Sequence, residues 1–236
     1  MSIKPKLAKQ NFLHLRSGVY TRSEEFEMIF KYWDEYLNGP VLEIGSGEGM
    51  HFRSLCTKFS EVIASDLDVS RWDKSLGKIH KMNATCIPFS DNSFGLIYSS
   101  NVLEHVSDIN LALEEMRRVL KADGKMLHIV PTVTWKITQL LGYYPAKFRD
   151  FIATGVFPKL KPSVHGVSDS HVEELNRFKH RYWENKFIKA GFSIADVSNL
   201  LFYSPYRFLP NWLKLRKFIA AIGITSCRAY LVSKDD

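Results

Sequence analysis

Short apolar runs alternate with longer periodic stretches along the first part of the chain. The runs lie at 41–44, 62–65, near 79, 94–99 and 125–130, and the stretches from about 50 to 59 and from 107 to 121 repeat apolar residues at helical spacing. The alternation returns with a helix from about 181 to 190 and strands near 192–197 and 226–233. This order predicts a parallel α/β sheet with crossover helices.

Residues 1–37 are predicted to form an N-terminal helical segment. Apolar residues recur every three or four positions from Ser23 to Leu37, with two glutamates in the first turn. The sequence Asn38-Gly39-Pro40 should end this helix before the first strand begins.

Residues 132–180 break the alternation. They are rich in aromatic and basic residues, and we expect Pro145, Pro158 and Pro162 to interrupt any long element there. Within a single domain of 236 residues, such a stretch indicates a functional insertion, which we interpret as a lid or cap over the substrate site.

The net charge of +7 is concentrated in the C-terminal part. Residues 1–131 carry 16 Lys/Arg against 17 Asp/Glu, whereas residues 132–190 carry 10 against 5 and residues 191–236 carry 6 against 3. This basic surface could face an anionic substrate, a nucleic acid or an anionic membrane, and an ordinary solvated face explains it equally well.

Hydrophobic stretches and cysteines indicate where the protein resides and whether it binds a metal. No apolar stretch approaches the roughly 20 residues that a membrane span needs, and the N-terminal residues lack an apolar signal block, so we expect a cytoplasmic protein. Three cysteines without a CxxC pair indicate neither a disulfide framework nor a zinc site, and no metal is expected.

A glycine-rich turn follows the first predicted strand. Gly45, Gly47 and Gly49 come directly after Val41–Ile44 and open a helix, where backbone N–H groups can meet a ligand. The third glycine comes two residues after the second, not three as in the dinucleotide fingerprint, which argues against NAD. Glu43 would be a poor neighbour for a pyrophosphate but suits a cationic ligand.

Asp66 and the segments that follow it complete the pattern. Asp66 closes the second predicted strand, where a carboxylate can accept hydrogen bonds from two ribose hydroxyls. Together with segments 83–97 and 99–106, these features resemble the class I S-adenosylmethionine-dependent methyltransferases that act on small molecules. The resemblance implies a Rossmann-like, doubly wound, seven-stranded sheet, mostly parallel with an antiparallel last strand and with helices on both faces.

The resemblance also implies which residues hold S-adenosylmethionine. Glu43, Gly45, Ser46 and Gly47 would hold its methionine part, Asp66 its ribose, and Leu67 would lie beside the adenine. Asn83 and Ala84 stand where the family usually has an aspartate before an apolar residue, so the adenine contact here would be neutral. Asn101 would line the methyl-donor end.

Three histidines are candidates for a catalytic role. Methyl transfer from a sulfonium is an in-line displacement, and deprotonation matters if the acceptor is a hydroxyl. His165 is the first candidate because it lies in the insertion beside Gly166, and His171 is the second. His105 begins the loop after the fourth strand and is a further candidate catalytic residue, since it could contact the substrate there. A structural role is the alternative for each.

We interpret the chain as a methyltransferase for a small-molecule acceptor. A looser likeness of residues 162–192 to bacterial methyltransferases of surface-polysaccharide synthesis favours an oxygen of a sugar or saccharide-linked acceptor, while quinone, lipid and nitrogen acceptors remain open. A nucleic-acid acceptor is not favoured, because 99–102 lack an N-P-P-[YF] tetrad. A non-catalytic cofactor-binding protein is a further alternative, and segments 135–151 and 203–218 could contact a membrane surface.

Overall fold

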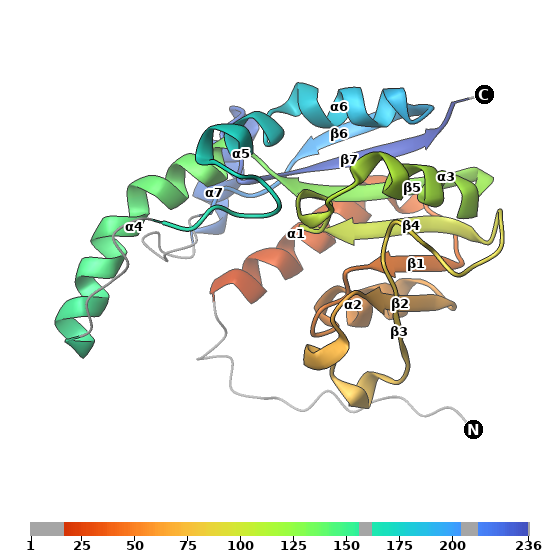
Figure 1. Cartoon of the computed structure of the whole chain (residues 1–236), viewed down its shortest axis with the longest axis horizontal. Helices are drawn as coiled ribbons and strands as arrows, with labels where there is room; N and C mark the ends of the chain where they lie inside the picture. The colour runs from red at the N-terminus through yellow and green to blue at the C-terminus, as the bar shows by residue number, and fades with distance from the viewer. Residues whose placement is uncertain (1–16, 156–161, 204–211, 236) are drawn as a thin grey trace.

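Seven strands form one sheet in the order β3-β2-β1-β4-β5-β7-β6 (Figure 1). In chain order they are β1 (Val41–Ile44), β2 (Val62–Asp66), β3 (Ile79–Lys81), β4 (Phe94–Ser100), β5 (Leu120–Pro131), β6 (Phe192–Asn199) and β7 (Cys227–Lys234). The strand β7 lies antiparallel between β5 and β6, whereas the pairs from β3 to β5 are parallel. The computed structural model, which describes residues 17–155, 162–203 and 212–235, confirms the predicted fold class.

Helices cover both faces of this sheet. They are α1 (Ser17–Trp33), α2 (Met50–Lys58), α3 (Ile109–Val119), α4 (Val133–Thr154), α5 (His171–Arg177), α6 (His180–Lys189) and α7 (Leu213–Ala221). Successive side chains of a strand point to opposite faces. Leu42 therefore packs with the apolar residues of α3 and α6, while its neighbour Val41 packs with those of α1.

The ends of two helices differ from the predicted ones. In place of a single helix to Leu37, α1 ends at Trp33 and a short 3₁₀ turn follows at Asp34–Tyr36. The helix predicted from 107 begins at Ile109, because Asp108 caps α3 through its Oδ1, which accepts a hydrogen bond from the Leu111 N–H at 3.1 Å. The predicted inner face of α1 is correct, since Phe26, Ile29, Phe30 and Trp33 are all buried.

The prediction that prolines interrupt any long element in the insertion is wrong for Pro145. It lies inside α4, a helix of 22 residues that extends away from the sheet (Figure 1). The Thr132 hydroxyl caps the start of α4, and Gly155, in the left-handed conformation, ends it.

Packing beside Pro145 offsets its cost. A proline within a helix costs about 3 kcal/mol, and the neighbouring Tyr143 and Ala146 are both buried. Of the other two prolines, Pro158 lies outside the described residues and Pro162 lies in a loop ahead of α5.

A buried ion pair anchors the first turn of α4. Lys136 Nζ lies 2.6 Å from Glu174 Oε2 of α5, and both side chains are fully buried. Lys136 also donates to Gln139 at 2.7 Å, and His171 Nδ1 lies 3.6 Å from the same glutamate oxygen. These contacts fix α5 against α4.

Lys136→Met should lower the free energy of unfolding by about 3–5 kcal/mol, because it leaves the Glu174 charge buried without its partner. The double variant Lys136→Met/Glu174→Gln should recover most of this loss, since no buried charge remains. Urea unfolding followed by circular dichroism measures both. An equal loss of unfolding free energy in the single and double variants would show that the unpaired Glu174 charge is not the cause of the loss.

Candidate functional site

A cavity of about 760 Å³ opens at the carboxyl ends of β1, β2 and β4. Parallel strands bring these ends to one edge of the sheet, and the strand order reverses between β1 and β4, which is where open α/β sheets bind ligands. All the residues predicted to hold the cofactor line this cavity, and so does His105. They are Glu43, Gly45, Ser46, Gly47, Asp66, Leu67, Asn83, Ala84 and Asn101.

The glycine-rich turn after β1 is held to the end of β2. The N–H groups of Gly45 and Ser46 both donate to the carbonyl oxygen of Ser65, at 2.8 and 2.9 Å. Gly45 has a φ of +78°, and a Cβ there would overlap the Val102 side chain. Gly47 has a φ of +55° and nothing within 4 Å of the position of a Cβ. The first glycine therefore permits close packing, and the second leaves room for a ligand.

Glu43 is a buried carboxylate in the cavity wall. Burial raises its pKa to about 7, a hydrogen bond with Ser46 opposes that rise, and the nearby Asp66 charge adds to it. Its Oε2 has no hydrogen-bond partner among the described residues. A buried acceptor without a donor is costly, and a cationic ligand in the cavity would supply one. This carboxylate therefore fits the ammonium and sulfonium of S-adenosylmethionine.

Two backbone donors orient the Asp66 carboxylate. Its Oδ2 accepts a hydrogen bond from the Gly47 N–H at 2.8 Å, and its Oδ1 accepts one from the Asp68 N–H at 3.0 Å. Each carboxylate oxygen has a further lone pair. The side chain can therefore accept hydroxyl groups of a ligand without giving up the contacts that position it.

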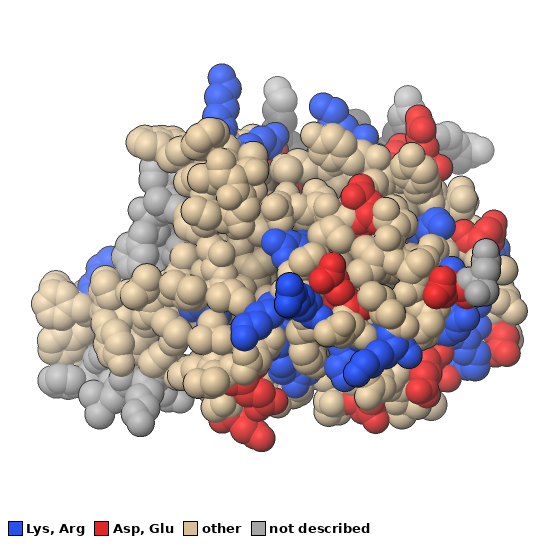
Figure 2. Space-filling view, turned by 90° about the horizontal axis from the view of Figure 1, so that it is seen from above, with Lys and Arg blue, Asp and Glu red and all other residues tan. Residues whose placement is uncertain are grey.

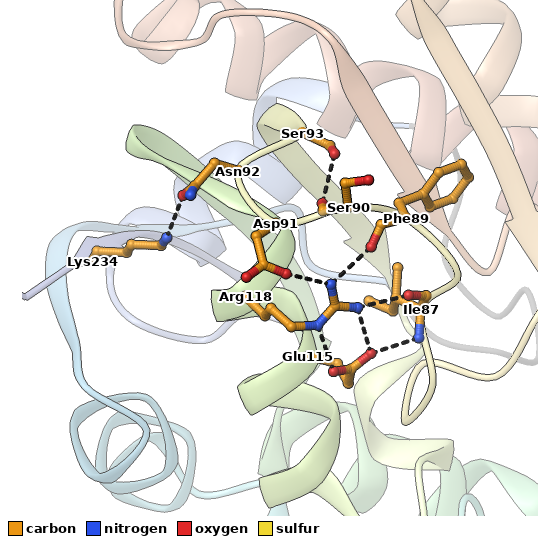
Figure 3. Close-up of polar contacts among 9 residues, drawn as sticks. All are labelled: Ile87, Phe89, Ser90, Asp91, Asn92, Ser93, Glu115, Arg118 and Lys234. Carbon is orange, nitrogen blue, oxygen red and sulfur yellow. Dashed lines mark hydrogen bonds and ion pairs between the residues drawn. The ribbon is translucent and has the colours of Figure 1, made fainter.

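The loop after β3 forms another wall of the cavity and is tied to α3 by Arg118 (Figure 3). The guanidinium makes five hydrogen bonds of 2.8 or 2.9 Å, to the carbonyl oxygens of Ile87 and Phe89 and the carboxylates of Asp91 and Glu115. A planar guanidinium with several donors suits such a cluster of acceptors. The network fixes the loop that carries Asn83 and Ala84.

The predicted adenine contacts lie at an open end of the cavity. Leu67 is 64% exposed, and Asn83 is also exposed. The Asn83 side-chain oxygen, which the sequence offers to the adenine amino group, accepts a hydrogen bond from the Thr85 N–H at 3.1 Å. Its second lone pair remains available to a ligand.

Two of the three candidate histidines lie beside one buried glutamate. Glu104 and His105 belong to a 3₁₀ turn after β4, and His165 lies in the loop before α5. The two imidazole rings are 4.5 Å apart, and their Nε2 atoms lie 4.0 Å (His105) and 3.7 Å (His165) from Glu104 Oε1. His105 lines the cavity, and His165 is not among its lining residues.

The environment of His105 lowers its pKa. Partial burial has the largest effect, the Glu104 charge opposes it, and His165 adds to the lowering. An imidazole with a lowered pKa is neutral at neutral pH and has a free lone pair. His105 can therefore accept a proton or bind a cation.

Backbone contacts fix His165 against this turn. The Val167 N–H donates to the Glu104 carbonyl oxygen at 3.3 Å. Gly166 has a φ of +73°, and a Cβ there would overlap that same oxygen. The Trp135 ring, from the first turn of α4, lies 4.9 Å from the His165 ring. The insertion thus places His165 close to the strand edge.

Glu104 is a site residue that the sequence interpretation missed. It is 1% exposed and stands between the apolar Leu103 and the candidate His105. An acidic residue between an apolar run and a histidine, in a loop at the carboxyl end of a strand, is the signal that would have indicated it. The pairing with His165 depends on the path of the insertion and has no such signal.

The affinity for S-adenosylmethionine should fall by about fivefold from pH 7 to pH 6, because a cation binds the ionised form of Glu43, whose pKa is about 7. Above pH 8 the affinity should level off. Isothermal titration calorimetry across this range measures the effect.

Glu43→Gln should bind weakly and without this pH dependence, and it should raise the free energy of unfolding of the free protein at pH 8, where the buried carboxylate is charged. Glu48→Gln, at another acid of the cavity wall, should keep the pH dependence. A flat wild-type profile would contradict the assignment.

The central part of the chain matches a methyltransferase domain family over residues 42–128. Among curated proteins, the UbiE ubiquinone/menaquinone biosynthesis C-methyltransferase of Pseudoalteromonas translucida is 34% identical and covers 56% of this chain, which spans only 55% of that relative. The UbiE protein of Shewanella sp. (strain ANA-3) is 26% identical and covers 73% of this chain and 76% of its own length.

Solved structures share the fold over nearly the whole chain. An S-adenosylmethionine-dependent methyltransferase from Clostridium acetobutylicum aligns with a TM-score of 0.57 and 15% identity, covering 91% of this chain and 92% of its own. A SAM-dependent methyltransferase from Aquifex aeolicus aligns with a TM-score of 0.54 and 17% identity, covering 92% and 96%. Residues 42–128 therefore match a methyltransferase domain, and the fold, with the glycine-rich turn and the two acids on the wall of one cavity, is that of S-adenosylmethionine-dependent methyltransferases.

Proposed function

We propose that the chain methylates an oxygen of a small-molecule acceptor, a sugar or a saccharide-linked compound. The observation that carries the proposal is the position of His105, which lines the same cavity as the glycine-rich turn and Asn101. Oxygen acceptors must lose a proton during transfer, and a neutral imidazole at the methyl-donor end can take it. The likeness of residues 162–192 to methyltransferases of polysaccharide synthesis supports the saccharide class.

The proposal assigns the cavity residues to parts of the cofactor. Glu43 and the turn from Gly45 to Gly47 hold the amino-acid part, and Asp66 holds the ribose. Leu67, Asn83 and Ala84 contact the adenine, and Asn101 lies near the methyl group. The orphaned Oε2 of Glu43 and the open surface of Gly47 support the first assignment.

The residues then divide the work of a displacement reaction. The bound cofactor supplies a methyl carbon on a positively charged sulfur. The acceptor oxygen bonds to this carbon in line as the carbon–sulfur bond breaks, and the hydroxyl proton passes to His105. The His165 ring packs 4.5 Å from that imidazole, and the Glu104 charge lies beside both rings. Because the thioether product has lost the sulfonium charge, it interacts less with Glu43 and is released more readily.

A quinone-type acceptor methylated at carbon is the second candidate. The two UbiE relatives favour it, since their names state C-methylation in ubiquinone and menaquinone biosynthesis. The two candidates differ in the atom that is methylated, carbon or oxygen, so the product that forms distinguishes them.

A methyl-transfer screen with labelled cofactor over saccharides, saccharide-linked lipids and quinols tests the proposal. We expect label on a saccharide oxygen and a loss of about 10²-fold or more in kcat for His105→Asn. His80→Asn, in β3 and outside the cavity lining, should keep the wild-type rate. Label on quinol carbon would select the second candidate, and cofactor binding without any product would indicate a non-catalytic protein.

We also propose that α4 and α7 contact a membrane surface, where a lipid-linked saccharide would reside. The described helices include none that is long and apolar enough to cross a membrane. Each of the two helices nevertheless exposes large apolar side chains at spacings of three and four, and the end formed by α4 carries few charges on the face seen in Figure 2. These residues are Ile137, Leu141, Tyr144, Phe148 and Ile152 in or along α4, and Trp212, Leu215, Phe218 and Ile222 along α7.

Exposed basic residues beside this apolar surface, among them Arg149, Lys214 and Lys217, match an anionic bilayer. The wild type should co-sediment with phosphatidylglycerol vesicles, and the double variant Leu141→Glu/Phe148→Glu should bind these vesicles about tenfold more weakly. Ile188→Glu, at a 60% exposed position on α6, should bind as the wild type does. Equal binding of all three proteins, or a wild type that dimerises instead of binding vesicles, would contradict this proposal.

A further inference from the structure

Three metal-ligating side chains converge beside the cavity. Glu104, His105 and His165 each offer one ligand atom, and these atoms all lie within 4.8 Å of one another. They come from two distant segments of the chain, the turn after β4 and the loop before α5. The backbone contacts of Gly166 and Val167 with Glu104 hold the two segments together.

The distances from Glu104 to the two histidines exceed those of hydrogen bonds and suit two ligands of one ion. The Nε2 atoms lie 3.7 and 4.0 Å from Glu104 Oε1, whereas N–H···O hydrogen bonds measure about 2.7–3.2 Å. A carboxylate that orients a catalytic imidazole would place one of these pairs at hydrogen-bond distance. Bonds of about 2.0–2.2 Å to a shared ion instead separate the ligand atoms by roughly 3–4 Å.

The Glu104 carboxylate lacks the partners that a buried charge requires. Its side chain is 1% exposed, and neither of its oxygens has a hydrogen-bond partner within the described ranges. No lysine or arginine nitrogen in the described part of the chain lies within 4.0 Å of it, and its charged neighbours at that range are the two histidines. Burying an ionised carboxylate is costly unless it is paired or coordinates a metal.

We propose that Glu104, His105 and His165 bind a divalent transition-metal ion. Two imidazoles and one carboxylate suit Zn²⁺, Co²⁺, Fe²⁺ or Mn²⁺ and leave coordination positions open. Ca²⁺ and Mg²⁺ favour sites made of oxygen ligands. Since His105 lines the cavity, a group bound in the cavity can reach an open position of this ion.

The chemical role of the ion rests on the proposed oxygen methylation. The ion would lower the pKa of a hydroxyl bound to it, and the proton would pass to solvent before the oxygen attacks the methyl carbon and the carbon–sulfur bond breaks. With the ion bound, His105 and His165 would be ligands, and the ion would take the place of His105 in the loss of the hydroxyl proton. Binding of the ion does not depend on the acceptor.

Titration of the untagged, chelator-treated full-length protein with CoCl₂ tests this proposal, with visible absorption as the readout. We expect one Co²⁺ per chain with the bands of a nitrogen- and oxygen-ligated ion. His165→Ala and Glu104→Gln should each weaken Co²⁺ binding by roughly 10–100-fold or more. Changes to residues that only support metal ligands already cause a loss of that size. His80→Asn, outside the cluster, should bind Co²⁺ as the wild type does.

Thermal unfolding gives a second readout that a folding defect cannot imitate. Glu104→Gln keeps the side-chain shape and removes a buried charge, so its metal-free form should unfold no earlier than the wild type. Co²⁺ should raise the wild-type midpoint and leave that of Glu104→Gln unchanged. Absence of Co²⁺ binding in the wild type, or undiminished binding in the variants, would overturn the proposal. A failure of oxygen methylation would leave these results unaffected.

Discussion

Hydrogen bonds hold the end of β1 and the turn after it against the end of β2. Two run from the turn to the Ser65 carbonyl, and another runs from the Gly47 N–H to the Asp66 carboxylate. The Ser65 hydroxyl also donates to the Glu43 carbonyl. Because Glu43 lies in β1 and Asp66 ends β2, these bonds place both carboxylates on one cavity wall. The loop after β3, fixed by Arg118, and the turn after β4 are arranged around that edge. The remaining site geometry therefore depends on how this turn is closed.

The carboxylates of the site differ in how far their hydrogen-bonding capacity is used. Asp66 is satisfied by backbone donors and still accepts further hydrogen bonds, whereas Glu43 and Glu104 are buried with oxygens that no described residue satisfies. A buried acid of this kind makes the free protein less stable and favours the binding of a cationic ligand. For Glu43 we propose the cofactor as that ligand, and for Glu104 a metal ion. The same electrostatic principle underlies both proposals.

The sequence predicts most of the sheet, and it groups residues that line one cavity, for a physical reason. Strand and helix periodicity follow from which side chains are buried, so Val41–Ile44 is predicted with its observed ends and the inner face of α1 is correct. The carboxyl ends of parallel strands must meet, which is why residues as distant as Glu43 and Asn101 line one cavity. What local patterns cannot supply are tertiary compensations. The burial of Tyr143 and Ala146 beside Pro145 is one, and the return of His165 to Glu104 is another.

Calorimetry on the wild type and Asp66→Ala measures whether the acids of the cavity wall bind S-adenosylmethionine. We expect one cofactor per wild-type chain and a loss of about 2 kcal/mol or more in binding free energy for the variant, because hydrogen bonds of ligand hydroxyls to a charged group are removed. A wild type that does not bind the cofactor, or an Asp66→Ala variant that binds it equally well, would show that these acids do not hold the cofactor.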